Sequence, residues 1–440
     1  MSDDELNGSP WSSGSYIHLM LASVVMQFLF MLTAIWVGTN GEDFYESNLD
    51  DIRLALRMQL AMGWMMCLIA GLGFSLLPII YDVKGFDKSV MRIYIGMNVS
   101  GQIAIILAIL SGKEEIFNSL ATVGITLLCG SLMILRNPAM TIIKNKKSED
   151  KKLGPFSYSI GALMPIIGLI ILGCWVLRNE ISGLGDFAED LVFEFFIPLT
   201  IGTVIISHFN RRLDWEIISP NNIGKVFAIY ALLLLLALFS EPLVERDDIS
   251  NRLSAILQFI PYMFFFIMLN PKKIISQIIE EMPHSKMVMA GVLWMPVIGF
   301  AGYMEAMSYV QTTDAMMSYQ RWILIFGVAF QVLWGFAIYL HEDHKKVSIH
   351  VRKSKILILL SINIAVLITV YSMLTSWMNS KPVEQYPRIG IAMFTLSYLL
   401  ILIYWLKETF FSLDNWHKTP MFYDKYLSNP KMGSGFDVED

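Results

Sequence analysis

Apolar segments about as long as a membrane-crossing helix recur along the whole chain. Apolar residues make up 55% of the 440 residues and charged residues only 16%, which is more apolar surface than a soluble protein can bury. We therefore expect an all-α fold, an integral membrane bundle whose surface faces the lipid bilayer. The sequence predicts twelve transmembrane helices, at residues 16–38, 54–80, 93–111, 118–136, 157–177, 190–209, 223–240, 253–270, 287–306, 319–340, 355–378 and 388–406.

The distribution of basic residues predicts how these spans are oriented. Lysine and arginine are retained on the cytoplasmic side of a membrane. If the N-terminus is cytoplasmic, the inner loops and the C-terminal tail hold 24 of the 33 basic residues, and the outer loops with their helix ends hold the other 9. We expect a multi-pass protein of the cell membrane with both termini in the cytoplasm.

A helix pattern recurs three times at a long interval. Gly71, Gly202 and Gly335 each lie within a long apolar segment and are separated by two nearly equal intervals. Pro165 and Pro296, in the fifth and ninth predicted spans, are separated by the same interval as the first two glycines. Self-similarity at a fixed interval indicates an internal repeat, here a unit of four helices.

Two further prolines follow the pattern. Pro138 and Pro271 are as far apart as Gly202 and Gly335, and each follows an asparagine at the end of a predicted span, where we expect proline to stop the helix. Two alternatives remain open: glycine and proline are common in membrane helices, and many transporters are built as six helices plus six. We predict three pseudo-symmetric repeats, residues 1–152, 153–285 and 286–406, followed by a cytoplasmic tail at 407–440.

The second span carries a family resemblance. Gly63, Gly71 and Pro78 have the glycine and proline spacing of a helix motif, His-x4-Gly-x7-Gly-x6-Pro, in the haem-copper oxidase subunit I superfamily, particularly its NnrS-like branch. Met58 stands where the motif has histidine. The resemblance implies a twelve-helix bundle with pseudo-threefold symmetry and cytoplasmic termini. It also implies histidines on helices two, six, seven and ten that hold haem and copper.

The histidines of this chain do not match those positions. The seven are His18, His208, His284, His341, His344, His350 and His417, and all lie at or beyond the predicted cytoplasmic helix ends. We expect His208 and His341 at helix C-terminal ends, where an imidazole with partial positive charge complements the helix dipole. Between His341 and His344 the i, i+3 spacing could hold a divalent metal, but the lysines that follow favour a solvated loop. We predict neither a cofactor nor enzymatic activity, with haem on Met58 as the open alternative because methionine is a recognised axial ligand.

Charged residues inside spans are candidates for a polar intramembrane site. Arg57 and Arg321 lie at equivalent depths in the second and tenth spans, Gln59 follows Arg57 closely, and Glu194 lies in the sixth span. Buried charges are costly in a bilayer unless they are paired or hydrated. We predict that Glu194 pairs with Arg321, or with Arg57 as second choice. The alternative is that the arginines reach toward the interface and that Glu194 faces water.

These patterns leave three hypotheses for function. The first is a haem-copper-oxidase-like protein without metal sites, an accessory, regulatory or sensing component of respiratory or nitric-oxide metabolism. The second is a secondary transporter of a small solute or ion, in which Pro78, Pro165, Pro198, Pro261 and Pro296 mark broken helices. The third is a structural subunit that packs on other membrane subunits. The net charge of −5 and the lack of a suitable basic block exclude nucleic acid as a partner.

Overall fold

The computed structural model describes residues 15–44, 49–72, 88–144, 163–181, 183–209, 218–219, 222–240, 248–279, 281, 283–310, 317–345, 353–379 and 385–410. Every regular element in these ranges is a helix, as the sequence predicts. The chain divides into two compact units. Unit 1 comprises Met1–Asp150, Phe156–Phe196 and Ile401–Ser428, and unit 2 comprises mainly Ile197–Leu400.

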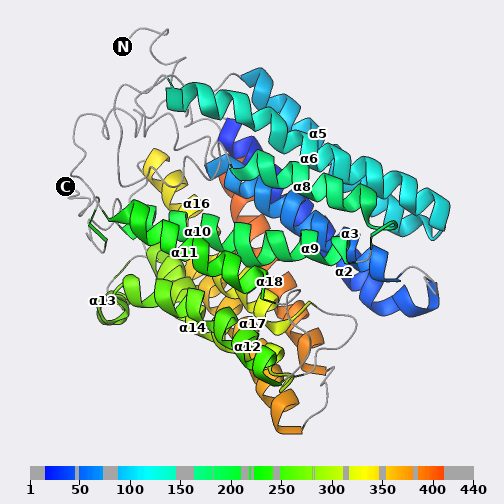
Figure 1. The fold of residues 1–440 in the computed structure, drawn as a ribbon. Helices are drawn as coiled ribbons and strands as arrows, with labels where there is room; N and C mark the ends of the chain where they lie inside the picture. Colours follow the sequence, from blue (N-terminus) through cyan, green and yellow to red (C-terminus); the bar gives the residue numbers. More distant parts are fainter. Residues whose placement is uncertain are drawn as a thin grey trace, which may run out of the picture. The chain divides into compact units, whose positions relative to one another are not determined.

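Unit 1 contains the first helices of the chain (Figure 1). Its elements are α2 (Ser15–Phe44), α3 (Leu49–Met58), the π-helix η1 (Gln59–Met65), α5 (Lys88–Ser111), α6 (Glu114–Lys144), α8 (Met164–Leu177), α9 (Leu184–Asp190) and the π-helix η3 (Leu191–Phe196). Only a short connection separates α2 from α3, so the first two helical segments run antiparallel.

The closest helix pair of unit 1 is α5 and α6, which lie side by side in Figure 1. They are joined through Gly112, whose φ of 64° is the left-handed conformation that glycine adopts readily after a helix end. A Cβ added at Gly101 would lie 2.8 Å from the carbonyl oxygen of Gly124, and one added at Gly124 would lie 2.8 Å from the carbonyl oxygen of Gly101. Small residues thus allow the two backbones to touch, as is common between membrane helices.

The helix stop predicted at Pro138 is wrong. Helix α6 continues from Glu114 through Pro138 to Lys144. A proline removes one backbone donor and kinks or weakens a helix, but it does not prevent the following residues from resuming the helical hydrogen bonds.

Unit 2 contains most of the second half of the chain (Figure 1). Its elements are α10 (Ile197–Ser207), α11 (Ile223–Leu238), α12 (Asp248–Met268), α13 (Pro271–Gln277), α14 (Pro283–Ala306), α15 (Tyr319–Trp322), the π-helix η5 (Ile323–Ala329), α16 (Phe330–Lys345), α17 (Lys353–Asn379) and the first part of α18 (Gln385–Phe410). Helix α14 packs on both α12 and α16.

The stop predicted at Pro271 is confirmed. Helix α12 ends at Met268, and Asn270 adopts a left-handed conformation with φ of 52°. The Asn270 side chain accepts a hydrogen bond from the Lys273 backbone N–H and so caps the short helix α13, which Pro271 begins. In contrast, Pro261 and Pro296 lie inside the continuous helices α12 and α14, so neither marks a broken helix.

Three long π-helical segments, of six or seven residues each, interrupt the helices of the described chain, and shorter π-helical stretches occur at 163 and at 208–209. Segments η1, η3 and η5 begin at Gln59, Leu191 and Ile323, so the two intervals between their starting positions are equal. All the residues of the three segments are buried. Long π-helical segments are rare and frequently mark functional sites, and no pattern in the sequence predicted them.

The structure supports a polytopic membrane protein. Within the described residues, eight helices are long and apolar enough to cross a membrane, and three shorter apolar helices lie at Met164–Leu177, Ile223–Leu238 and Ala392–Tyr404. Leu232, Ile267 and Leu357 are each more than half exposed, as expected for side chains that face lipid. The count of twelve spans is finer than this finding and stays a prediction.

Candidate functional site

Arg57, one of the predicted site residues, forms an ion pair with Glu189. It lies in the last turn of α3, and its Nε is 3.1 Å from Oε2 of Glu189 in α9. The Glu189 side chain is 2% exposed and the Arg57 side chain 24% exposed. Glu189 was not among the site residues predicted from the sequence. Removing one partner of such a buried pair is costly because it leaves the other charge uncompensated.

The other predicted site residues lie at π-helical positions or beside them. Met58 is buried at the end of α3, and Gln59 is buried at the start of η1. Glu194 is buried within η3 in unit 1. Arg321 lies in α15 of unit 2, where its backbone N–H donates to the side chain of Ser318, the N-cap residue. Pairing of Glu194 with Arg321 remains a prediction.

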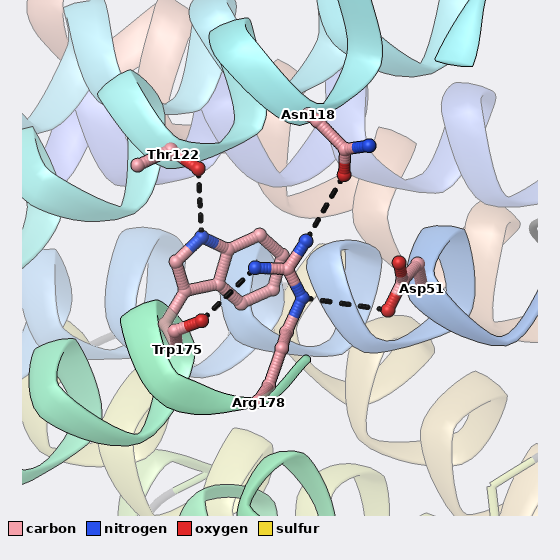
Figure 2. Close-up of polar contacts among 5 residues, drawn as sticks. All are labelled: Asp51, Asn118, Thr122, Trp175 and Arg178. Atoms are coloured by element: carbon pink, nitrogen blue, oxygen red, sulfur yellow. Dashed lines mark hydrogen bonds and ion pairs between the residues drawn. The ribbon is translucent and has the colours of Figure 1, made fainter. Parts of the chain in front are cut away.

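A second arginine in unit 1 joins three helices (Figure 2). Arg178, just after α8, donates from Nη2 to Oδ1 of Asn118 in α6 at 3.0 Å and from Nε to Oδ1 of Asp51 in α3 at 3.4 Å. Nη1 of Arg178 donates to the Trp175 carbonyl oxygen, and the guanidinium carbon lies 4.1 Å from the centre of the Trp175 ring. Trp175 in turn donates from Nε1 to Thr122 at 3.1 Å. These contacts fix α3, α6 and α8 together at one end and suggest a structural role.

Unit 2 contains a partly buried carboxylate that was not predicted from the sequence. Glu305, near the end of α14, accepts hydrogen bonds from the backbone N–H groups of Tyr319 and Gln320 at the start of α15. Its carboxylate also interacts electrostatically with Arg321. A carboxylate at a helix N-terminus is favoured by the unpaired N–H groups and the helix dipole. The sequence signal was a lone glutamate at the end of an otherwise apolar span.

Hydrogen bonds connect the Glu305 region to neighbouring helices. Gln320 donates from Nε2 to Oε1 of Gln258 in α12 at 3.0 Å, and Tyr319 shares a hydrogen bond with Ser372 in α17 at 3.1 Å between the hydroxyl oxygens. A Cβ at Gly302 would lie 2.8 Å from the amide of Gln320, so this glycine leaves room for the amide. The result is a buried polar network spanning α12, α14, α15 and α17 within unit 2.

Two histidines of unit 2 also lie closer to the core than expected. His208 follows the end of α10, as predicted, but both His208 and His284 are buried. Nε2 of His208 is 3.3 Å from the Ser285 hydroxyl oxygen, and its ring packs edge-on against His284, Phe336 and Tyr339. This aromatic packing, which depends on contacts between distant segments, was not visible in the sequence.

Two aromatic side chains lie against Gly202 in α10. A Cβ at Gly202 would lie 3.2 Å from the Tyr230 ring and 3.0 Å from the Phe265 ring, and these two rings stack with centroids 4.5 Å apart. Aromatic side chains of α11 and α12 therefore pack against α10 at this glycine. Among the residues that the structure describes, no group of three or more histidine, cysteine, aspartate or glutamate side chains could hold a metal ion.

Comparison with known proteins adds no family assignment: no protein-family profile matches this chain, and no curated protein matches it significantly.

Proposed function

We propose that the protein is a membrane bundle of twelve helices, built as three four-helix repeats on the plan of haem-copper oxidase subunit I but working without its metals. The observation that carries this proposal is the equal spacing of η1, η3 and η5 along the chain. A π-helical segment of six or seven residues is rare enough that three at one interval argue for descent from one unit. In this arrangement the second, sixth and tenth helices are equivalent.

Helix contacts within each unit support the same repeat. A Cβ at Gly63 would touch Gln102, and one at Gly327 would touch Val366. Each residue of the second pair follows its counterpart in the first pair by twice the interval between the starts of successive long π-helical segments. Gly168 lies against the carbonyl oxygen of Cys129. Gly299 lies against that of Phe259, again about one repeat later. Two observations differ from the predicted repeat: α6 continues past Pro138, and Gly202 lies against Tyr230 and Phe265 whereas Gly335 lies against the carbonyl oxygen of His284.

The role that we propose is that of an accessory, regulatory or sensing component of respiratory or nitric-oxide metabolism. Function resides in sites rather than in the fold, so a bundle of this plan can persist without its redox centres. Other membrane subunits are the expected partners, and both termini are expected to be cytoplasmic.

Two measurements test this role. The purified protein reduced with dithionite should show no haem Soret band, and a Soret band would contradict a metal-free function. Membranes from the native host with the protein deleted should differ from wild-type membranes in their rate of oxygen or nitric-oxide consumption. Unchanged rates for both gases would refute the accessory role.

The predicted Glu194–Arg321 pair belongs to this proposal as a polar site on the sixth and tenth helices. Replacing either residue with glutamine should lower stability, because the remaining charge loses its partner. The double replacement should recover part of the loss, which is the signature of direct coupling. Additive losses in a thermal-unfolding cycle would show that the two residues are not partners.

A secondary transporter is the second candidate, and the Glu305 network favours it. An ionisable group within a membrane span commonly marks an ion or proton pathway. Proteoliposomes containing the wild-type protein should then acidify faster than empty vesicles under an imposed potassium-diffusion potential, as read by an internal pH dye, and Glu305→Gln should abolish the difference. Equal acidification of wild-type and empty vesicles would contradict proton-coupled transport.

A further inference from the structure

Three buried glutamines of unit 1 share an unusual property. Gln27 in α2, Gln59 in η1 and Gln102 in α5 are completely buried. Both amide atoms of Gln27, both of Gln59 and Oε1 of Gln102 make no hydrogen bond to any described residue. Buried polar groups in proteins are nearly always paired, so a set of such atoms needs an explanation. In a bilayer the cost of leaving them unpaired is high.

Helix register places Gln27 and Gln59 at one level. The Ser23 hydroxyl donates to the carbonyl oxygen of Trp64 at 3.3 Å, which fixes α2 against η1. Gln27 lies one turn after Ser23 on the same face of α2. Gln59 lies one turn of a π-helix before Trp64, because hydrogen bonds in such a helix join residues i and i+5. Because the two segments run antiparallel, both glutamines are displaced from the Ser23–Trp64 contact in the same direction.

Gln102 approaches the same face of η1 from the third helix, about one turn from the level of Gln27 and Gln59. Asn98 donates from Nδ2 to the carbonyl oxygen of Met62 at 3.3 Å, and Gln102 donates from Nε2 to Oδ1 of Asn98 at 2.6 Å. A Cβ at Gly63 would lie 2.5 Å from Cδ of Gln102, so the amide of Gln102 occupies the space that this glycine leaves. Gly63 follows Gln59 by about one turn along the same face of η1.

We propose that these three side chains form a buried hydration site, which holds ordered water between α2, η1 and α5. The unpaired atoms comprise three carbonyl oxygens that accept and two amide nitrogens that donate. This balance suits a neutral guest that both donates and accepts, since the amide nitrogens oppose a cation and the oxygens oppose an anion. A buried water typically makes two to four hydrogen bonds, which three amides can supply.

Hydroxyl-radical footprinting tests the site in the unmodified protein. An X-ray pulse converts ordered water into radicals that oxidise side chains beside it. Met62 and Trp64 on η1 are completely buried, and so is Met289 in α14, which serves as the control. Oxidation of Met62 or Trp64 should exceed that of Met289 at least fivefold. Equal, low oxidation of all three would overturn the proposal.

A stability cycle provides the second test. Gln27→Leu and Gln59→Leu should each lower the melting temperature, and the double variant should lose clearly less than the sum, because the glutamines share one water cluster. A rise in melting temperature for either single variant would show that the glutamine amide binds no water, and it would overturn the proposal. Additive losses in the double variant would also overturn it. Gln331 is the matched control, since its amide bonds to Gly327 and Asn363; Gln59→Leu and Gln331→Leu should be additive.

Discussion

Replacement of Arg178 by methionine is the most direct test of the packing in unit 1. Methionine keeps an apolar stem but removes the guanidinium, which bonds to Asn118 and Asp51 and lies over Trp175 (Figure 2). A hydrogen bond to a charged group contributes about 1.5–3 kcal/mol. The contact with Asp51 contributes about 1 kcal/mol or less, because it is long and Asp51 is 33% exposed. The cation–π contact adds about 0.5–1 kcal/mol.

These contributions are not fully additive, and we expect Arg178→Met to lower the free energy of unfolding by about 2–4 kcal/mol. The measurement is a denaturant titration of the purified protein in mixed micelles, followed by tryptophan fluorescence. Arg178→Lys should lose part of this stability, because an ammonium group lacks the planar fork that reaches several acceptors. Arg92→Met is the control: this arginine on α5 is exposed, and its loss should change the value by less than about 0.5 kcal/mol. A loss for Arg178→Met no larger than that for Arg92→Met would refute the structural role of the cluster.

Three further predictions follow from single contacts. Gly101→Ala should destabilise the protein by about 1–3 kcal/mol, because the added methyl group would meet backbone atoms. Gly96→Ala on the same helix should not destabilise it, because the added methyl group has open space there. Equal effects of the two variants in the same titration would contradict the prediction. In intact cells a cysteine at the exposed Lys113 should react with a membrane-impermeant thiol reagent, and a cysteine at the exposed Lys272 should not. The three native cysteines are buried and should contribute little background labelling. The reverse labelling pattern would show that the predicted topology is inverted. Glu305→Ala should lower the free energy of unfolding by about 0.5–2 kcal/mol, because α15 loses its cap, and Glu305→Gln should lower it less, because an acceptor remains. Similar losses for the two variants would argue against a capping role.

Helix positions followed well from the sequence because they depend on local apolar character. The spans predicted at 355–378 and 287–306 correspond to α17 at Lys353–Asn379 and α14 at Pro283–Ala306. Proline was a less reliable guide. The stop at Pro271 is right because Asn270 can adopt a left-handed conformation and cap the next helix, whereas α6 continues through Pro138.

Partners of charged side chains did not follow from the sequence. Depth along a helix can be counted, so the sequence placed Arg57 in a span, where a charge needs a partner or water. Which carboxylate it meets depends on the rotation and tilt of two helices, and the structure brings Glu189 to it. Glu305 was overlooked for a related reason, because its role depends on the start of α15, which the chain reaches only after a connection.

The sequence by itself therefore determined the class of the protein, a helical membrane bundle, because apolar composition and segment length are properties of the chain alone. It also contained the long interval between Gly71, Gly202 and Gly335, on which the proposed repeat is based. Only the tertiary structure decided where π-helical segments form, since they depend on neighbouring packing and have no fixed residue signature. It likewise decided which polar groups meet inside the bundle, because helix rotation is set by contacts between segments far apart in the chain.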